Sequence, residues 1–412
     1  MAALMVLTGW LGATPAAADE PGSMGLDASL RGAYWSSSRD LDGREHLPVA
    51  ALWLRGRWDP DPTAAVRLDA FVRNDDLFHE RDTSARLREG YLDVRAGPVD
   101  LRLGKQIIAW GRADRINPTD ILTPRDFTLL VPEDGDQRFG TTGARATLRA
   151  AGLAVTGVVL PTFEPHVIPI REPSPPTRLR RRVPDDPVMQ GALKVERTGG
   201  RVDWSVSAFD GYDLFPDLEL VAVGPQGVDL ALTHHRVRVV GADAAVAIGP
   251  YTVRGEGAYT FTERDASGAQ VKSSFFFLVL GADRTLPQDV YVNVQYVLRV
   301  VTDFRRPAAV TDPIAREVAL QQALINDQLD RVKHAVAVRL ARSWLNETLR
   351  AEIGAVVSAT RGDYALRPKV AYAVTDRLKV TAGADLFGGP TPSFFGRLRD
   401  TSTAYLEMRW DF

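Results

Sequence analysis

The chain has 412 residues, 45% of them hydrophobic, and a formal net charge of −2. A charge so close to zero offers no basic surface for nucleic acid, so we expect no nucleic-acid partner. The chain lacks cysteine, which excludes disulfide bonds and thiolate metal sites. The six histidines show neither a metal-ligand spacing nor a hydrolase nucleophile–base motif. The sequence therefore predicts no enzyme, no metal and no cofactor.

The first residues have the pattern of a secretory signal. An apolar run over residues 2–11 is followed by three alanines at 16–18, which form a small-residue cleavage site, although a basic first region is missing. We predict a signal peptide over residues 1–18 and one domain over residues 19–412; a short apolar tail is the alternative. Beyond residue 18 no apolar run reaches about 18 residues, so no transmembrane helix is predicted.

From residue 24 onward, apolar and polar residues alternate in segments of about ten residues, as in membrane β-barrels. Clear examples are residues 24–35, 66–73, 290–299 and 349–357. A period of two gives a strand one apolar and one polar face. A soluble β-sandwich shares this pattern, but no helical segments are available to cover so many apolar faces. The alternation therefore favours a barrel wall.

Short and long connections alternate along the chain. The expected short turns are 59–62, 96–98, 150–152, 198–200, 249–250, 286–287, 345–346 and 375–376. The expected long connections are 37–46, 74–84, 109–137, 161–187, 211–233, 262–271, 302–331 and 387–400, with 360–363 as a short exception. This rhythm predicts an all-β, antiparallel transmembrane β-barrel of about 18 strands, or about 16 if two weak strands belong to loops. Both termini would lie at the end with the short turns.

The connection after the fifth predicted strand carries alternating charges and two prolines. Asn117-Pro118 and Thr123-Pro124 favour one ordered path over a mobile loop. Buried charges need partners, so the segment is able to fix itself to the inner wall by ion pairs. We expect this loop to fold into the lumen; a solvated surface loop is the alternative. The predicted pore-constriction and lumen residues are Lys105, Gln106, Trp110, Arg112, Asp114, Arg115, Asn117, Asp120, Arg125 and Asp126, with Arg67, Arg102 and Arg145 on the wall.

The last strand places apolar residues at every second position and ends on an aromatic residue. Ala404, Leu406, Met408, Trp410 and Phe412 share one face. The pattern is similar to the C-terminal assembly signal of bacterial outer-membrane proteins, with Trp410 and Phe412 as its key residues. The resemblance implies location in the bacterial outer membrane and recognition by the barrel-insertion machinery. Outer-membrane lipid and lipopolysaccharide would then be partners.

The run LRLGKQIIAWGRADRINPTDILTPRDF, residues 101–127, resembles a segment of Gram-negative outer-membrane barrels of porin-like type. In those proteins a strand ending G-[RK]-Q-x-x-x-W-G precedes an I-N-P-x-D turn. The matching residues are Gly104, Lys105, Gln106, Trp110, Gly111, Ile116, Asn117, Pro118 and Asp120. The segment looks related to alginate-export and phosphate-selective porin families, and the resemblance implies a solute channel or an exporter.

Basic residues outnumber acidic ones on the predicted inner face, and such a wall concentrates anions. Mixed charges that only brace the wall are the alternative. The leading function is passive diffusion of small anionic or amphiphilic solutes. One alternative is the outer-membrane exit of a lipid, hydrophobic-compound or polysaccharide export system, with periplasmic export partners. Another is a blocked barrel with a structural or ligand-capturing role.

Two further outer loops carry distinct patterns. Asp312 as N-cap and Pro313 at the first position predict a helix that continues toward residue 331 and covers the pore or packs on other loops. The basic run at residues 178–182 would meet lipopolysaccharide or an anionic solute, or form a solvated charged surface.

Overall fold

The computed structural model describes residues 22–37, 44–77, 82–262 and 270–412. The predicted signal peptide lies outside the described residues.

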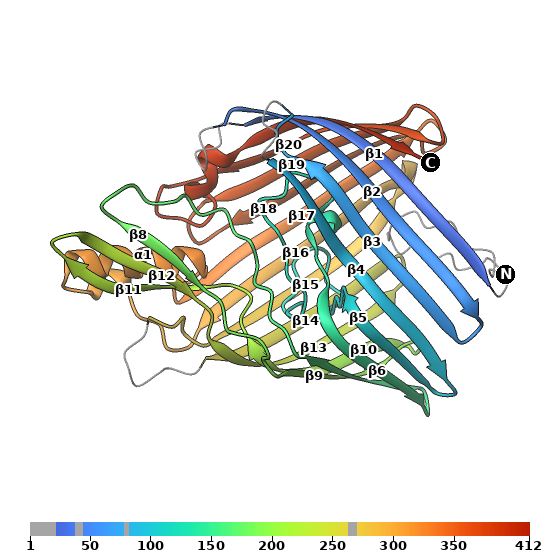
Figure 1. Cartoon of the computed structure of the whole chain (residues 1–412), viewed down its shortest axis with the longest axis horizontal. Helices are drawn as coiled ribbons and strands as arrows, with labels where there is room; N and C mark the ends of the chain where they lie inside the picture. Colours follow the sequence, from blue (N-terminus) through green and yellow to red (C-terminus); the bar gives the residue numbers. More distant parts are fainter. Residues whose placement is uncertain (1–21, 38–43, 78–81, 263–269) are drawn as a thin grey trace.

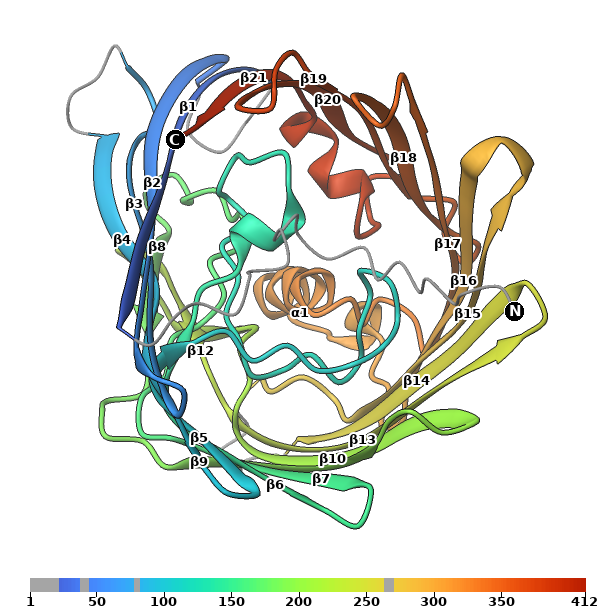
Figure 2. The same cartoon turned by 90° about the vertical axis from the view of Figure 1, so that its right-hand side faces the viewer.

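Eighteen strands of the described chain form one closed antiparallel barrel (Figures 1 and 2). Each strand pairs with its neighbours in the ring, and the last strand pairs with the first, so the sheet has no free edge. The strands are β1 (Ser23–Ser37), β2 (His46–Asp61), β3 (Ala64–Asn74), β4 (Thr83–Ala96), β5 (Val99–Gln106), β6 (Thr141–Ala150), β7 (Leu153–Leu160), β9 (Gln190–Arg197), β10 (Val202–Tyr212), β13 (Arg236–Ile248), β14 (Tyr251–Thr262), β15 (Phe275–Leu286), β16 (Val290–Val301), β17 (Val332–Trp344), β18 (Leu349–Ser358), β19 (Tyr364–Ala373), β20 (Leu378–Gly388) and β21 (Thr403–Asp411). The predicted fold class and strand number are confirmed.

Alternation along each strand separates an apolar outer face from a polar inner face. On β1, Leu26 and Leu30 are 69% and 51% exposed on the outside of the barrel. Arg31, the residue after Leu30, points to the opposite face; it is 5% exposed and forms an ion pair with Asp136 in the lumen. Successive strand side chains point to opposite faces, so the sequence pattern alone dictates this arrangement.

The short turns and the long connections lie at opposite ends of the barrel (Figure 1). β1 begins and β21 ends on the side of the short turns. Trp410 and Phe412 are exposed on the outer face, and the Phe412 N–H donates to the Ala28 carbonyl of β1 over 2.9 Å. Their role in assembly stays a prediction. Of the helices that the structure describes, none has the length and apolar character needed to cross a membrane.

Three long connections build an outer cap over the barrel end. The cap consists of a three-stranded sheet, β8 (Arg178–Arg182), β11 (Asp217–Gly224) and β12 (Gly227–Thr233), and the helix α1 (Pro313–Ile325). The Asp312 side chain accepts a hydrogen bond from the Ala315 N–H over 2.8 Å, which confirms Asp312 as the N-cap residue of the helix. The helix is shorter than expected: it ends at Ile325, and Asp327 already adopts a positive φ of 53°.

Apolar packing joins α1 to the cap sheet. Leu218, Leu232, Val318 and Ile325 form a buried cluster between them. The basic run at residues 178–182 is therefore not an irregular loop, because its Leu179 packs against this cluster and its strand pairs in parallel with β12. Short 3₁₀ turns complete the connections: η2 (Asp134–Gln137), η3 (Pro287–Asp289), η4 (Pro307–Ala309) and η5 (Gly396–Thr401).

The connection from β5 to β6, residues 107–140, runs inside the barrel (Figure 2). We call it the inward loop. Its position confirms the predicted inward-folded loop after the fifth strand.

Candidate functional site

One buried carboxylate, that of Glu256 on β14, holds the first half of the inward loop. Glu256 is 1% exposed, and its two oxygens accept five hydrogen bonds. The donors are the backbone N–H groups of Arg112 (2.8 Å), Ala113 (3.0 Å) and Thr119 (2.8 Å), the Thr119 hydroxyl (2.8 Å) and Asn117 Nδ2 (3.2 Å). A buried carboxylate without such donors would be costly. This Glu256 anchor therefore fixes the path of the chain through residues 112–119.

Gly111 makes the close approach to Glu256 possible. Its φ is +97°, and a Cβ at this position would overlap the Glu256 carboxylate. The next side chain, Arg112, points to the same wall, where Nε lies 2.5 Å from Asp243 Oδ1 and Nη2 lies 3.8 Å from Glu196. The positive charge of Arg112 is thus compensated by the barrel wall.

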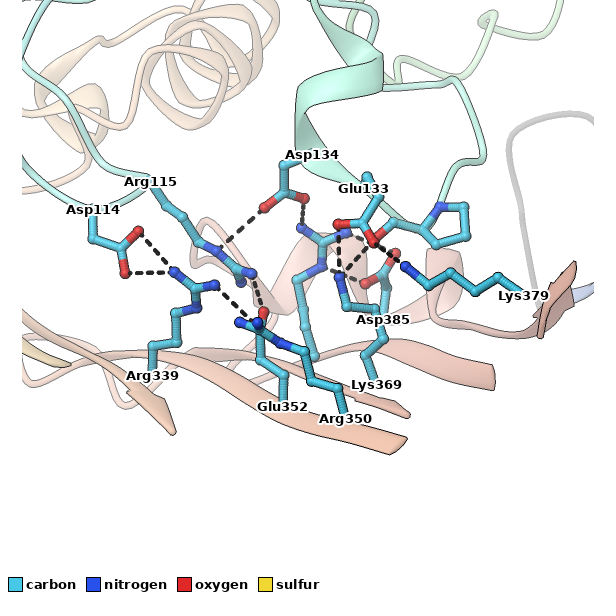
Figure 3. Close-up of polar contacts among 12 residues, drawn as sticks. Asp114, Arg115, Glu133, Asp134, Arg339, Arg350, Glu352, Lys369, Lys379 and Asp385 are labelled. Atoms are coloured by element: carbon cyan, nitrogen blue, oxygen red, sulfur yellow. Dashed lines mark hydrogen bonds and ion pairs between the residues drawn. The ribbon is translucent and has the colours of Figure 1, made fainter. Parts of the chain in front are cut away.

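The next turn of the inward loop enters a network with β17 and β18 (Figure 3). Arg115 Nη2 donates to Glu352 Oε1, while Arg339 Nη2 donates to Glu352 Oε2 over 2.9 Å. Arg339 Nη1 also lies 3.2 Å from Asp114 Oδ2. Arg115 has a φ of +68°, a left-handed conformation that non-glycine residues seldom adopt, so these ion pairs hold it against local strain. We call these four residues the Glu352 network.

The network continues through the 3₁₀ turn η2. Asp134 lies 3.5 Å from Arg115 Nε and accepts a hydrogen bond from Arg367 of β19. Burial disfavours the charged form of Asp134, but the guanidinium groups of Arg367 and Arg115 outweigh burial and lower its pKa from 3.8 to about 2. Beside it, Lys369 Nζ donates to Glu133 Oε2 over 2.9 Å (Figure 3).

The second half of the inward loop is bound to the other side of the barrel. Asp136 pairs with Arg31 of β1 over 2.6 Å, and Asp126 pairs with Arg86 of β4 over 2.7 Å. Apolar contacts accompany these pairs, in a buried cluster of Ala51, Trp53, Phe71, Leu129, Val131 and Phe139. A second cluster joins the beginning of the loop to β7, β10, β13 and β14: Ile108, Trp110, Leu122, Val158, Leu160, Phe209, Val237, Val239 and Ala258. The loop therefore crosses the lumen between two opposite stretches of wall (Figure 2).

Three predicted lumen residues are held in contacts with the wall or with neighbouring segments. Gln106 is 0% exposed and donates to the Gly143 carbonyl over 3.2 Å. Trp110 is 7% exposed within the apolar cluster on β7 and β10. Lys105 donates to the Glu164 carboxylate. These three side chains position the loop.

The remaining predicted loop charges are paired within the loop. Asp120 lies 3.1 Å from Arg125 Nη2 and 2.5 Å from Arg138 Nη2. The Arg125 N–H donates to His166 Nδ1 over 2.8 Å, which connects the inward loop to the connection after β7. Asn117 and Asp126 have the partners given above. The loop therefore carries many charges but little uncompensated charge.

The three predicted wall arginines differ in their pairing. Arg67 lies 2.7 Å from Asp59, and Arg102 forms two hydrogen bonds with Asp93, of 2.6 and 2.7 Å. Arg145 faces Arg102 in the β5–β6 register. Across the residues that the structure describes, no carboxylate lies within ion-pair distance of Arg145. It is thus a source of uncompensated positive charge on the inner wall.

The period-two alternation of their strands puts Glu256 and Glu352 on the polar inner face, but the sequence did not identify them, or Asp243, as the residues that hold the loop. Glu256 and Asp243 stand among small residues on their strands, Glu256 between two glycines. In a sequence, an isolated inward carboxylate between small residues indicates a site where a second chain segment binds, because the small residues leave room for that segment to approach.

A pocket of about 290 Å³ lies in the lumen between the inward loop, the cap and the wall. We call it the lumen pocket. Its apolar side is formed by phenylalanines, and Arg299 of β16 lies with its guanidinium carbon 4.2 Å from the Phe275 ring centre and 5.0 Å from that of Phe277. Arg299 Nη1 donates to the Asn326 carbonyl over 2.8 Å, while its buried Nε has no partner within the described part of the chain. A cation beside aromatic rings suits a flat, amphiphilic solute.

His166 also borders the lumen pocket. Burial lowers the pKa of His166 to about 3, so its imidazole is neutral in the folded protein at ordinary pH. The cationic side chains that line the pocket are therefore Arg299 and Lys272, and Lys272 Nζ lies 3.0 Å from Asp213.

No family model and no curated protein matches the sequence. Solved structures do match its fold. Pseudomonas aeruginosa OccK11 (OpdR) has a TM-score of 0.56 at 12% identity, covering 95% of this chain and 98% of that one. Pseudomonas aeruginosa OpdK, solved with vanillate, has a TM-score of 0.57 at 10% identity, covering 94% and 98%. Acinetobacter baumannii OccAB2 has a TM-score of 0.56 at 9% identity, covering 94% and 98%. At these identities the likeness establishes the 18-stranded barrel fold.

Proposed function

We propose that this chain is a passive diffusion channel of the bacterial outer membrane for small amphiphilic solutes, with a preference for anions. The observation that carries the proposal is the inward loop, which is fixed across the lumen of a closed barrel and borders a pocket of phenylalanines and Arg299. A loop fixed in this way restricts the passage without filling the barrel, and side chains beside the restriction select solutes.

The preference for anions rests chiefly on Arg145, which has no carboxylate within ion-pair distance in the described chain. Arg299 contributes less, because Asp327 Oδ2 lies 3.7 Å from its Nη1, although its buried Nε has no acceptor there. A fixed positive charge in a low-dielectric passage concentrates anions and repels cations. The resemblance of residues 101–127 to alginate-export and phosphate-selective porins agrees with this, because alginate and phosphate are both anions.

The proposed solute class is small aromatic carboxylates. OpdK, which shares the fold, was solved with vanillate, a flat ring that carries a carboxylate. The lumen pocket offers the matching chemistry, with Phe275 and Phe277 for the ring and Arg299 for the carboxylate.

The test is recording from the purified protein in planar bilayers. We expect discrete conductance steps, a reversal potential on the anion side in a potassium chloride gradient, and a current that falls when vanillate is added. Arg145→Gln should move the reversal potential toward cations, and the shift should shrink in concentrated salt because the Debye length falls from about 10 Å at 0.1 M to about 3 Å at 1 M.

Arg299→Gln should weaken the block by vanillate by about tenfold, since a buried charge-assisted hydrogen bond is worth roughly 1.5–3 kcal/mol. The matched control is Arg180→Gln, which removes an exposed arginine of the cap. It should change neither the reversal potential nor the block by vanillate. A protein that inserts but gives no conductance steps would contradict the channel. Equal block in the Arg299→Gln and Arg180→Gln variants would contradict the role of the lumen pocket.

A further inference from the structure

The cap covers the lumen pocket at the barrel end with the long connections. Seen from the side, α1 lies beyond the ends of the strands, and seen along the barrel it lies within the outline of the ring (Figures 1 and 2). The last residue of α1, Ile325, and the next residue, Asn326, line the lumen pocket. A solute that enters from this end passes the cap, so the contacts that fix the cap determine how open this entrance is.

One buried carboxylate, that of Asp217 at the start of β11, joins three of the long connections. Asp217 is 0% exposed. From the connection that contains α1, Gln322 Nε2 donates to Asp217 Oδ1, and Asn326 Nδ2 donates to it over 3.3 Å. From the connection after β14, the Lys272 N–H donates to the same oxygen over 3.1 Å. The other oxygen, Oδ2, lies 2.9 Å from Nδ1 of His235, the residue before β13. Asp217 therefore fixes the cap to the rim of the barrel.

His235 lies between two carboxylates of β11. Its Nδ1 faces Asp217, and its Nε2 lies 3.2 Å from Glu219 Oε1. An ionised carboxylate only accepts hydrogen bonds, and a neutral imidazole has a single N–H to donate. Both contacts are therefore satisfied only by the doubly protonated, cationic ring. The side chains of Asp217, Glu219 and His235 are 0%, 17% and 23% exposed, so water does little to replace a missing partner.

The groups around His235 also favour its cationic form. The hydrogen bond to Asp217 raises the pKa of His235 above its ordinary value of 6.5, and the negative charges of Asp217 and Glu219 act in the same direction. Burial and the ammonium group of Lys272 oppose this rise. The adjacent His234 differs, because burial lowers its pKa. Of these two histidines, His235 is therefore the one that exchanges a proton near neutral pH.

We propose that His235 is a proton-dependent latch that holds the cap against the barrel rim. The cationic ring bridges Asp217 and Glu219 and so fixes β11 to the start of β13. When the ring loses a proton, one carboxylate faces a nitrogen lone pair, the two carboxylates lose the cation between them, and the cap loosens. Because the folded pKa is the higher one, this contribution is fully present below about pH 6.5 and is lost as pH rises through the folded pKa. The latch does not depend on transport; its effect on solutes rests on the proposed function.

Hydrogen exchange of the purified full-length barrel, measured by mass spectrometry between about pH 5 and about pH 8.5, tests the latch. The amides to follow are those of Leu218, which donates to Gln322 Oε1, and Lys272, which donates to Asp217. Their protection, corrected for intrinsic rates, should be constant in acid. It should fall about three- to tenfold as pH rises past the folded pKa of His235, because a charge-assisted hydrogen bond is lost.

Glu219→Gln separates the latch from other contributions to stability. The amide that replaces the carboxylate donates to the unprotonated Nε2 of a neutral His235, so the contact no longer needs the second proton. Protection should therefore stay high over the whole pH range. His235→Ala should instead give low protection at every pH. The matched control is His334→Gln on the outer wall, where Nδ1 of the histidine lies 2.7 Å from the Tyr296 hydroxyl; it should respond to pH as the wild type does.

The heat-dependent gel mobility of a folded barrel checks each variant, and if His235→Ala does not fold, Glu219→Gln still tests the latch. Protection of these amides that is independent of pH in the wild type would overturn the proposal. So would a response to pH in Glu219→Gln equal to that of the wild type, because the response would then come from another group.

Current recordings in planar bilayers connect the latch to the passage. Benzoate, an aromatic carboxylate with one titratable group, is added on the side of the long connections. Its block should set in about threefold faster above the folded pKa of His235 than below it, and Glu219→Gln should remove this difference. If amide protection responds to pH but benzoate never blocks, the proposed solute class is wrong and the latch stands. If benzoate blocks but protection does not respond to pH, the latch is wrong and the channel stands.

Discussion

The Glu256 anchor and the Glu352 network hold the same loop by different chemistry. Glu256 accepts three backbone N–H groups directly, has no cationic partner among its hydrogen-bond donors and is 1% exposed. Glu352 is bound only by side chains, chiefly Arg115 and Arg339, whose own exposures are 32% and 24%. The first arrangement fixes the backbone, whereas the second fixes side chains that have alternative partners.

This difference determines how each anchor responds to damage. Removing Glu256 leaves several buried donors without an acceptor, and each such donor costs about 1–3 kcal/mol. Removing Glu352 leaves Arg115 beside Asp134 and Arg339 beside Asp114, so the charges keep partners. Glu256, a single carboxylate that binds backbone N–H groups, is therefore the support whose removal disturbs the loop more. It does so without taking part in an ion pair through its hydrogen-bond donors.

The largest effect is expected from removing the segment that both anchors hold. Deleting residues 112–126 should raise single-channel conductance by at least about twofold, because the loop narrows the passage. Planar-bilayer recordings measure this directly. An unchanged conductance and ion preference would mean that the segment does not restrict the passage, and the proposed function would lose its main support.

Replacing Glu256 should come next. Glu256→Ala should speed hydrogen exchange at the amides of Arg112, Ala113 and Thr119 by about tenfold or more, since these amides lose a buried acceptor. Open-channel current noise should rise as the loop moves. Hydrogen exchange with mass spectrometry provides the measurement. The exchange rates in Glu256→Gln, which keeps one carbonyl oxygen, should lie between those of Glu256→Ala and those of the wild type. If these amides exchange in Glu256→Ala at the wild-type rate, Glu256 does not hold the loop.

Glu352→Gln should have a smaller effect. Amide exchange over residues 112–119 should change by less than about threefold, because partly exposed ion pairs contribute little individually and Arg115 and Arg339 retain other carboxylates. The comparison with Glu256→Ala under identical conditions is the control. If Glu352→Gln loosens the loop as much as Glu256→Ala does, the two supports do not differ in the way described.

The smallest effect concerns pH. The folded pKa of Asp134, about 2, lies below its ordinary value of 3.8, so its ion pairs contribute stability that is fully present above the ordinary value and lost as pH falls through the folded value. Amide protection in η2, corrected for intrinsic rates, should thus stay constant from neutral pH down to about pH 5 and weaken only in stronger acid. If amide protection in η2 already weakens near pH 6, the lowered pKa of Asp134 does not account for it. Asp134→Asn should remove this component of the acid response.

The sequence by itself determined the wall of this protein. Alternation with a period of two is a local property, so the inward and outward residues of a strand such as β1 follow from the chain alone. The short turns at 59–62 and 249–250 and the long connections between them were equally visible, because turn residues act on their immediate neighbours. The proline-rich, charged connection after β5 also indicated an ordered loop.

Only the tertiary structure decided which groups hold that loop. Arg112 meets Asp243, 131 residues away, and Arg115 meets Glu352, 237 residues away. These partners are brought together by closing eighteen strands into a ring with a particular stagger, and neither closure nor stagger is encoded within one strand. Sequence showed that the loop charges needed partners. The geometry of the closed barrel brought Glu256, Asp243 and Glu352 to the loop from among the many inward carboxylates, because these three face it where it crosses the lumen.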